Sequence, residues 1–178
     1  LATHVGAPSF DIAIVNITGD KADLTPTGNA LNEPTGQAYP YTINGTLTNN
    51  TDDAITIQYR ITPKLASCSD GAVVTANVTI EPTPVAAISN NSQQICNGEA
   101  FTDMVVTNEA THTLVPFFDL DIVATTGDIG DLAATGNALT TGSGISYPYT
   151  ITGTLTNSTF DPIVIEYRAT PGVGTCAG

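Results

Sequence analysis

The stretch Ala54-Ile55-Thr56-Ile57-Gln58-Tyr59-Arg60-Ile61-Thr62 alternates apolar and polar side chains along its whole length. Successive side chains of a β-strand point to opposite faces of a sheet. The alternation therefore predicts a strand with one buried and one exposed face. The side chains expected to point inward are Ile55, Ile57, Tyr59 and Ile61.

A second feature is an internal repeat with a constant offset. Thr27–Leu31 returns unchanged as Thr135–Leu139, and Tyr39–Ile43 returns as Tyr147–Ile151, in each case 108 positions later (135 − 27). This offset is too long for a solenoid repeat of ~20–50 residues and suits one small domain of ~100 residues. The chain is therefore expected to hold two copies from a tandem array of similar domains.

Further alternating stretches complete each copy. The predicted inward sets are Phe10 with Ile12 and Ile14; Tyr41 with Ile43, Gly45 and Leu47; Val74 with Ala76, Val78 and Ile80; and, in the second copy, Ile163 with Ile165, Tyr167 and Ala169. Two opening strands are expected at Gln94–Cys96 and Met104–Thr107. Turn-forming Gly, Asn, Asp and Pro separate the stretches. About seven short strands per copy, without helical periodicity, predict an all-β fold of immunoglobulin-like antiparallel β-sandwiches.

The copies meet at a proline-containing segment, Ile80-Glu81-Pro82-Thr83-Pro84-Val85, which is typical of a stiff connector. The first domain is therefore placed at residues 1–81 and the second at 82–178. By the repeat phase, the first copy lacks its opening strands, and the second lacks a counterpart of the closing strand at Ala72–Ile80. We expect a piece of a longer covalent array. The alternative is a subunit completed by a neighbour's strand.

The charge restricts the partners. The formal net charge is −13, with only four Lys and Arg residues. Nucleic acid and anionic membrane surfaces are poor partners, because both are bound mainly through Lys and Arg. No apolar run approaches the ~20 residues of a membrane helix, so membrane insertion is not expected. Arg60 and Arg168 occupy one repeat position and are each expected to pair with a carboxylate on the same sheet face or the neighbouring strand.

Three cysteines also follow the repeat. Cys68 and Cys176 are equivalent, and Cys96 lies near the start of the second copy. Thiols repeated in a polar, strand-rich chain favour a Cys96–Cys176 disulfide and an oxidising compartment. The partner of Cys68 would then lie outside residues 1–178. The alternative is three buried thiols.

Several motifs together resemble a known family. They are Ile151–Pro171, Thr175–Gly178, Val78–Pro84 and Gln94–Glu99. These runs resemble the PKD-like domains that occur in tandem in giant secreted adhesins of gliding bacteria of the Bacteroidetes type. The resemblance implies a β-sandwich fold, export to the cell surface and a role in adhesion or filament formation. It brings no catalytic residue, and only Cys96 and Cys176 match a recurring position, as a disulfide.

One carboxylate pattern suggests a metal. Asp20 and Asp23 follow Gly19, and the pattern returns as Asp128 and Asp131 after Gly127. Two carboxylates in a glycine-containing loop could hold a weakly bound Ca²⁺ if Thr or backbone oxygens contribute. The alternative is a surface turn capped by Asp.

No recognisable catalytic signature is present, whether G-x-S-x-G, H-E-x-x-H or a phosphate loop. We therefore expect a non-enzymatic, extracellular, structural or adhesive segment of a large surface protein, with neighbouring copies of the repeat as its partners. A carbohydrate-binding module is the alternative, with stacking platforms at Tyr39, Tyr41, Tyr147 and Tyr149. A second alternative is a filament subunit completed by strand donation.

Overall fold

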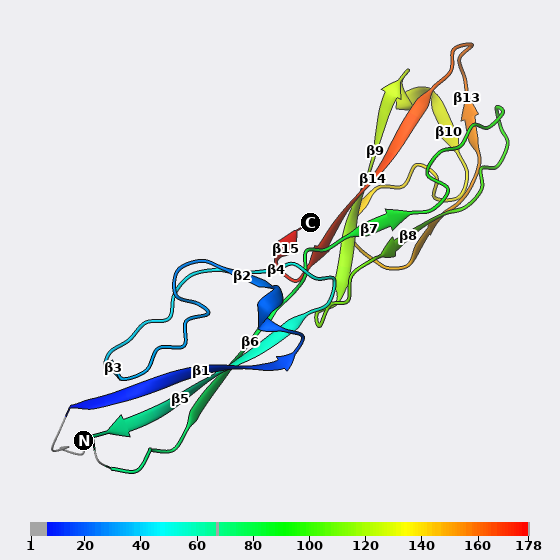
Figure 1. The fold of residues 1–178 in the computed structure, drawn as a ribbon. Coiled ribbons are helices and arrows are strands. Elements are labelled where there is room, and N and C mark those ends of the chain that lie inside the picture. Colours follow the sequence, from blue (N-terminus) through cyan, green and yellow to red (C-terminus); the bar gives the residue numbers. More distant parts are fainter. Residues whose placement is uncertain (1–6, 67, 178) are drawn as a thin grey trace. The chain divides into compact units, whose positions relative to one another are not determined.

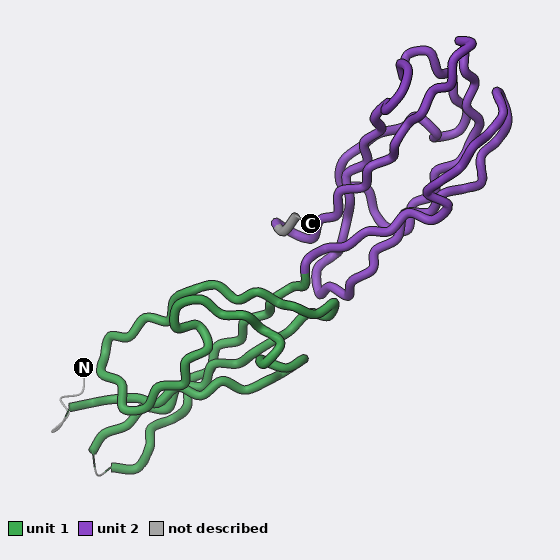
Figure 2. The backbone as a smooth tube through the Cα atoms, turned by 45° about the horizontal axis from the view of Figure 1, so that its top comes forward, with its two compact units in different colours: residues 1–82 green, residues 83–178 purple. Residues whose placement is uncertain are grey.

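The computed structural model describes residues 7–66 and 68–177, with the backbone alone for residues 176 and 177. It confirms the all-β prediction: antiparallel strands dominate, and the only helices described are two single turns of 3-10 helix (Figure 1). The chain divides into two compact units, Leu1–Pro82 (unit 1) and Thr83–Gly178 (unit 2) (Figure 2). The division falls inside the proline-containing segment where the junction was expected.

Unit 1 is built on one four-stranded antiparallel sheet. Its strands, in spatial order, are β3 (Gln37–Ala38), β1 (Pro8–Thr18), β5 (Ile55–Leu65) and β6 (Val74–Ile80). The single turn η1 (Lys21–Asp23) follows β1, and a short pair joins β2 (Leu24–Pro26) to β4 (Leu47–Asn49).

Unit 2 has the corresponding sheet and a second sheet besides. The first contains, in spatial order, β11 (Gly142–Ser146), β9 (Pro116–Thr126), β14 (Val164–Val173) and β15 (Cys176–Ala177). The second contains β12 (Tyr149–Ile151), β8 (Met104–Asn108) and β7 (Ala86–Ile88). The remaining elements are η2 (Ile129–Asp131) and the pair of β10 (Leu132–Ala134) with β13 (Leu155–Asn157).

The elements of the two units coincide at the repeat offset. β1 and β9, η1 and η2, β2 and β10, and β4 and β13 each begin and end 108 residues apart. The central strands β5 and β14 correspond as well, although β14 is one residue shorter. The sequence repeat is therefore also a repeat of structure.

The cores form around most of the predicted inward sets, but one set is wrong: Val74, Ala76 and Val78 of β6 are exposed, and only Ile80 of that strand packs against the core of unit 1. Because β6 is the last strand of its sheet, its side chains are covered from one side at most. In unit 1, Ile55, Ile57 and Tyr59 are 1%, 0% and 7% exposed and pack with Phe10 and Ile12. In unit 2, core side chains come from both sheets: Phe118 and Leu120 from β9 face Met104 and Val106 from β8. The two sheets of unit 2 thus pack face to face, as in a sandwich.

Two predicted strands are wrong. Gln94–Cys96 is irregular, and the strand that opens unit 2 is β7. In unit 1, Tyr41–Ile43 forms no strand, although the identical Tyr149–Ile151 forms β12 by pairing with β8. Within the described residues, unit 1 has no counterpart of β8. Because a strand needs a hydrogen-bonding neighbour, the same sequence is regular in one unit and irregular in the other.

Candidate functional site

The two units differ at one edge of the central sheet, because the counterpart of β6 at the repeat offset would fall after Gly178, the last residue of the sequence. In unit 1, β5 pairs with β1 on one side and with β6 on the other, from Ile55↔Ile80 to Ile61↔Val74. In unit 2, β14 pairs with β9 along its length, but on its other side only Gly172 and Val173 pair, with β15. Among the described residues, no strand covers the rest of that side of β14. We call this stretch, residues 164–171, the open edge.

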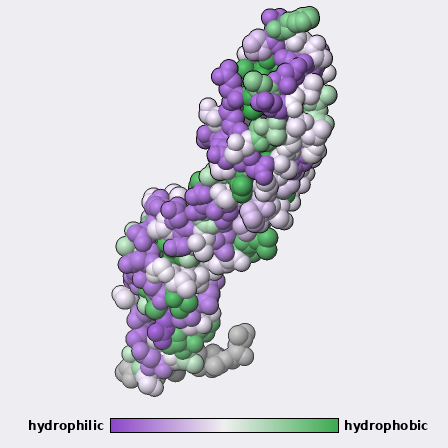
Figure 3. Space-filling model, turned by 90° about the vertical axis from the view of Figure 1, so that its right-hand side faces the viewer, coloured by the Kyte–Doolittle hydropathy of each residue, from purple (hydrophilic) through white to green (hydrophobic). Residues whose placement is uncertain are grey.

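The side chains near the open edge are less buried than their counterparts. Ile163, Ile165 and Tyr167 are half-buried, whereas the equivalent Ile55, Ile57 and Tyr59 are buried. Val164, on the other face of the strand, is 50% exposed. Figure 3 shows mostly hydrophilic and intermediate residues with small hydrophobic groups on the face drawn, so exposed apolar groups of this kind are local.

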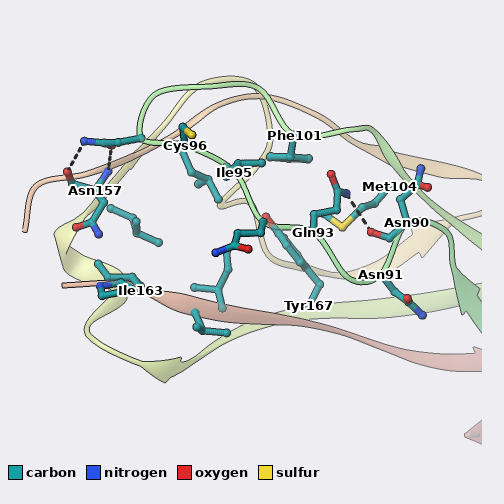
Figure 4. A pocket seen from close by; sticks show the side chains of 17 residues that line it. Asn90, Asn91, Gln93, Ile95, Cys96, Phe101, Met104, Asn157, Ile163 and Tyr167 are labelled. Atoms are coloured by element: carbon teal, nitrogen blue, oxygen red, sulfur yellow. Dashed lines mark hydrogen bonds between the residues drawn. The ribbon is translucent and has the colours of Figure 1, made fainter. Parts of the chain in front are cut away.

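A pocket of about 340 Å³ lies beside the open edge. Its lining includes Ile163, Ile165 and Tyr167, together with Met104 and Leu155. The opposite wall is the irregular segment between β7 and β8, with Ile95, Cys96 and Phe101 (Figure 4). The pocket is therefore bounded by the core of unit 2 on one side and by a loop on the other.

Amide side chains brace that loop. The Gln93 amide donates to the carbonyls of Asn90 and Thr102 at 3.0 and 2.8 Å, and its oxygen accepts from the Thr102 N–H at 2.7 Å. Asn97 exchanges hydrogen bonds with the backbone of Asn157, at 3.1 and 2.7 Å. Both groups of bonds fix the loop, so these amides act in the scaffold.

Asn157 stands at one end of the pocket, next to Ile163 (Figure 4). Its counterpart in unit 1, Asn49, is 6% exposed and donates from its side-chain amide to the carbonyls of Asp53 and Ile80, at 2.8 and 3.1 Å. The Asn157 amide makes the first of these bonds, to Asp161 at 2.8 Å. Within the described residues it makes no counterpart of the second, because the position equivalent to Ile80 lies after Gly178.

Asn49 and Asn157 were not predicted from the sequence. Both end the tripeptide Leu-Thr-Asn, at Leu47–Asn49 and Leu155–Asn157. An Asn at the same repeat position in both copies was a usable signal. In unit 1, however, the Asn49 amide bonds the carbonyl of Ile80, which lies 31 residues later in the sequence. No local sequence pattern indicates a contact over such a separation.

The predicted Cys96–Cys176 disulfide is not formed in this structure, where Cys96 is a free, exposed thiol. Cys96 and Val164, the first residue of β14, line the same pocket, whereas the backbone of Cys176 pairs with Val173, the last residue of β14. Nine steps along a strand span on the order of 30 Å. A disulfide needs Cα atoms within about 7 Å. The side chain of Cys176 lies outside the described atoms, and Cys68 is a free, exposed thiol.

The carboxylates considered for calcium have a capping role. Asp20 precedes η1 and accepts from the Ala22 N–H at 3.0 Å, and Asp128 precedes η2 and accepts from the Gly130 N–H at 2.8 Å. The Ala22 hydrogen bond, with a second from Asn16, lowers the pKa of Asp20. Asp23 and Asp131 close the same turns. In the described part of the chain, no three His, Cys, Asp or Glu side chains gather as metal ligands.

The tyrosines considered as stacking platforms pack on core phenylalanines. Tyr39 and Tyr41 lie 4.7 and 5.8 Å from the Phe10 ring, measured between centroids. Tyr147 and Tyr149 lie 4.9 and 5.9 Å from Phe118. Of the four, only Tyr39 is more than half exposed, at 54%. The four rings therefore lie at the rims of the two cores. They do not form the exposed row of aromatic side chains that sugar stacking would need.

The predicted pairing of Arg168 is confirmed. Its guanidinium lies 2.9 Å from the Glu166 carboxylate, two residues away on the same face of β14. The hydrogen bond lowers the pKa of Glu166 and raises the pKa of Arg168. Both side chains are at least half exposed, so the pair adds little stability.

Neither a family model, nor a curated protein, nor a solved structure matches this chain. In the residues that the structure describes, no helix has the length and hydropathy needed to cross a membrane. The candidate site is therefore interpreted from its geometry alone: a pocket lined by core residues of unit 2 and by the segment between β7 and β8.

Proposed function

We propose that this chain is a structural repeat segment of a large secreted cell-surface protein, in which successive domains act as spacers of an adhesive fibre or stalk. The observation that supports it most is the return of the same scaffold at an offset of 108 residues. The hydroxyl of Tyr59 donates to Ala30 in unit 1, and that of Tyr167 donates to Ala138 in unit 2. The features that recur in both copies are therefore contacts of the core and of the turns, which belong to the scaffold.

The hydrogen bonds that recur in both units stabilise the fold of each unit. Asn29 and Asn137 each donate to a Tyr hydroxyl and to a backbone carbonyl across the same loop. Thr27 and Thr135 each bond a threonine 19 residues on. A chain that repeats the same stable domain becomes longer and carries several copies of each surface. Both properties suit a spacer or a multivalent binder. The resemblance to PKD-like domains of surface adhesins points the same way.

The acidic surface fits this role. A net charge of −13 keeps an extended polymer solvated and limits collapse of neighbouring fibres onto each other. The carbohydrate-binding alternative has less support, because its tyrosines pack around Phe10 and Phe118.

Cell-surface exposure is the first requirement of this proposal. Intact source cells should be labelled by an antibody raised against residues 1–178, and brief external proteolysis should remove the signal while a cytoplasmic marker persists. Labelling that appears only after the cells are permeabilised would contradict the proposal.

A further inference from the structure

We propose that Asn44 is a site of spontaneous covalent modification, at which the Gly45 nitrogen displaces the side-chain amide and the residue becomes aspartate or isoaspartate. The sequence contains two Asn-Gly pairs, Asn44-Gly45 and Asn97-Gly98. In such a pair the glycine has no side chain to keep its backbone nitrogen away from the Asn side-chain carbonyl. This inference goes beyond the spacer role and does not depend on it, because it concerns the chemistry of one loop.

The reaction needs only water as a co-reactant. The Gly45 nitrogen bonds to the side-chain carbonyl carbon of Asn44, its proton passes to the departing amide nitrogen, and ammonia leaves. Water then opens the resulting cyclic imide at either of its carbonyls. One opening gives aspartate, and the other gives isoaspartate, in which the main chain runs through the former side chain. Nothing is oxidised or reduced, and either product adds a negative charge.

The reacting groups of the first pair are not held. Asn44 is exposed, and in the part of the chain that the structure describes neither its side-chain amide nor the Gly45 N–H makes a hydrogen bond. The backbone of Asn44 is held instead, through hydrogen bonds that it exchanges with Asn29. The attack therefore requires no hydrogen bond to open at the reacting atoms.

The second pair is equally exposed, but its reacting groups are held. The Asn97 amide donates to the Asn157 carbonyl at 3.1 Å, and its oxygen accepts from the Asn157 N–H at 2.7 Å. The nitrogen that would attack belongs to Gly98, and its N–H donates to the Leu155 carbonyl at 3.0 Å. These bonds must open before the nitrogen can attack. The fold thus protects Asn97 and leaves Asn44 reactive.

Exposure of the reactive loop is a property of the repeat. In unit 2, the equivalent Thr152 is also exposed and lies outside the strands, although the neighbouring strand β12 is paired with β8. Thr152 exchanges backbone hydrogen bonds with Asn137, as Asn44 does with Asn29. A threonine has no amide to lose. The same loop is therefore chemically reactive in unit 1 and inert in unit 2.

Conversion to isoaspartate loosens unit 1. The Asn29 N–H donates to the Asn44 carbonyl at 3.0 Å, and the Asn29 side-chain oxygen accepts from the Asn44 N–H at 2.6 Å. Isoaspartate places an additional carbon between this N–H and this carbonyl, so the two bonds lose their common spacing. The backbone has little room to adjust, because a Cβ on Gly45 would lie 2.0 Å from the Thr27 carbonyl oxygen.

Ageing of the complete chain in mildly alkaline buffer tests the inference. Peptide mapping by mass spectrometry should detect conversion of Asn44 at least about tenfold faster than conversion of Asn97, because the hydrogen bonds at Asn97 must open first. Electron-based fragmentation should identify isoaspartate at position 44. In denaturant the two residues should convert at similar rates, because the protection of Asn97 is lost with the fold.

Asn44→Thr is the matched variant, since it copies Thr152 of unit 2. Ageing of the wild-type chain should accelerate amide exchange in unit 1 by about fivefold or more, the effect of losing one hydrogen bond. Exchange in unit 2 should stay unchanged. Ageing of the variant should leave exchange in both units unchanged.

Three results would overturn the inference. The first is absent conversion of Asn44, or conversion at the same rate as Asn97, in the folded chain. The second is slow conversion of Asn97 in denaturant as well, which would assign the difference to the local sequence. The third is unchanged exchange in unit 1 after Asn44 has become isoaspartate. None of these results bears on surface exposure, so failure of this inference and failure of the spacer role are distinguishable.

Discussion

The hydroxyl of Tyr59 donates a 2.6 Å hydrogen bond to the carbonyl of Ala30, a residue 29 positions earlier in the chain. Tyr167 and Ala138 repeat this bond at 2.8 Å. Each bond ties the central strand to the loop that contains the Thr-Gly-Asn-Ala-Leu repeat. Both acceptors belong to residues that are at most 5% exposed, so water cannot easily replace the hydroxyl.

Removing this hydroxyl should destabilise each unit separately. Tyr59→Phe should lower the free energy of unfolding of unit 1 by about 1–2 kcal/mol, because a buried carbonyl loses its donor while the ring is kept. Tyr167→Phe should do the same to unit 2. Hydrogen exchange resolved by unit measures both. Loss of stability in the unit that was not changed would contradict the separate role of each bond.

Alkaline pH should weaken unit 2. Burial raises the pKa of Tyr167 to about 12, above its ordinary value of 10.0. A raised folded-state pKa means that the stabilisation is complete below pH 10 and is lost as the pH rises towards 12. Tyr167→Phe should remove this part of the pH dependence. The measurement is the melting temperature of unit 2 between pH 9 and 12, and an unchanged slope in the variant would contradict the assignment.

Gly153 should tolerate no side chain. A Cβ placed there would lie 2.1 Å from the Thr135 carbonyl oxygen, and its φ is +142°. Gly144 also has a positive φ, +65°, but meets nothing within 4 Å. Gly144→Ala should therefore cost about 1–2 kcal/mol from backbone strain alone. Gly153→Ala should cost more, because the backbone must also move. Equal costs in denaturant titrations would show that the close approach is unimportant.

Asn49 should stabilise its unit more than Asn157 does. Asn49→Ala removes two hydrogen bonds to carbonyls that it holds at a buried position, and should cost unit 1 about 2–3 kcal/mol. Asn157→Ala removes one such side-chain bond and should cost unit 2 about 1 kcal/mol. Chemical denaturation followed by exchange in each unit tests this order. The reverse order would contradict the assignment of two such bonds to Asn49 and one to Asn157.

The caps of the 3-10 turns should act without metal. Asp128→Ala should destabilise unit 2 by about 1 kcal/mol through loss of the Gly130 contact. The loss should be the same in calcium and in chelator, since Asp128 already accepts a backbone hydrogen bond. A melting temperature that rises with calcium in the wild-type chain, but not in this variant, would restore the calcium hypothesis.

The sequence predicted what depends on local alternation. Ile55, Ile57 and Tyr59 lie inward as expected, because a period of two is a property of the strand itself. It could not predict what depends on a neighbour. Tyr41–Ile43 and Tyr149–Ile151 are identical in sequence, and only the copy beside β8 is a strand.

The position of Cys96, a free thiol in this structure, also depends on the neighbours of its segment. Cys96 and Cys176 lie near the two ends of one copy in sequence, and we expected them to meet. In this structure Cys96 lines the pocket that also contains Val164, the first residue of β14, whereas the backbone of Cys176 pairs with Val173, its last residue. Sequence position alone did not indicate at which end of the sheet each cysteine lies.

The central claim is that the chain consists of two similar spacer domains that each resist extension. Single-molecule extension of residues 1–178, held at both ends, tests it most directly. The account predicts two separate unfolding events, each releasing about 25–30 nm of chain, the contour length of a domain of this size. A single event that releases the whole chain, or smooth extension without a force peak in either unit, would contradict it.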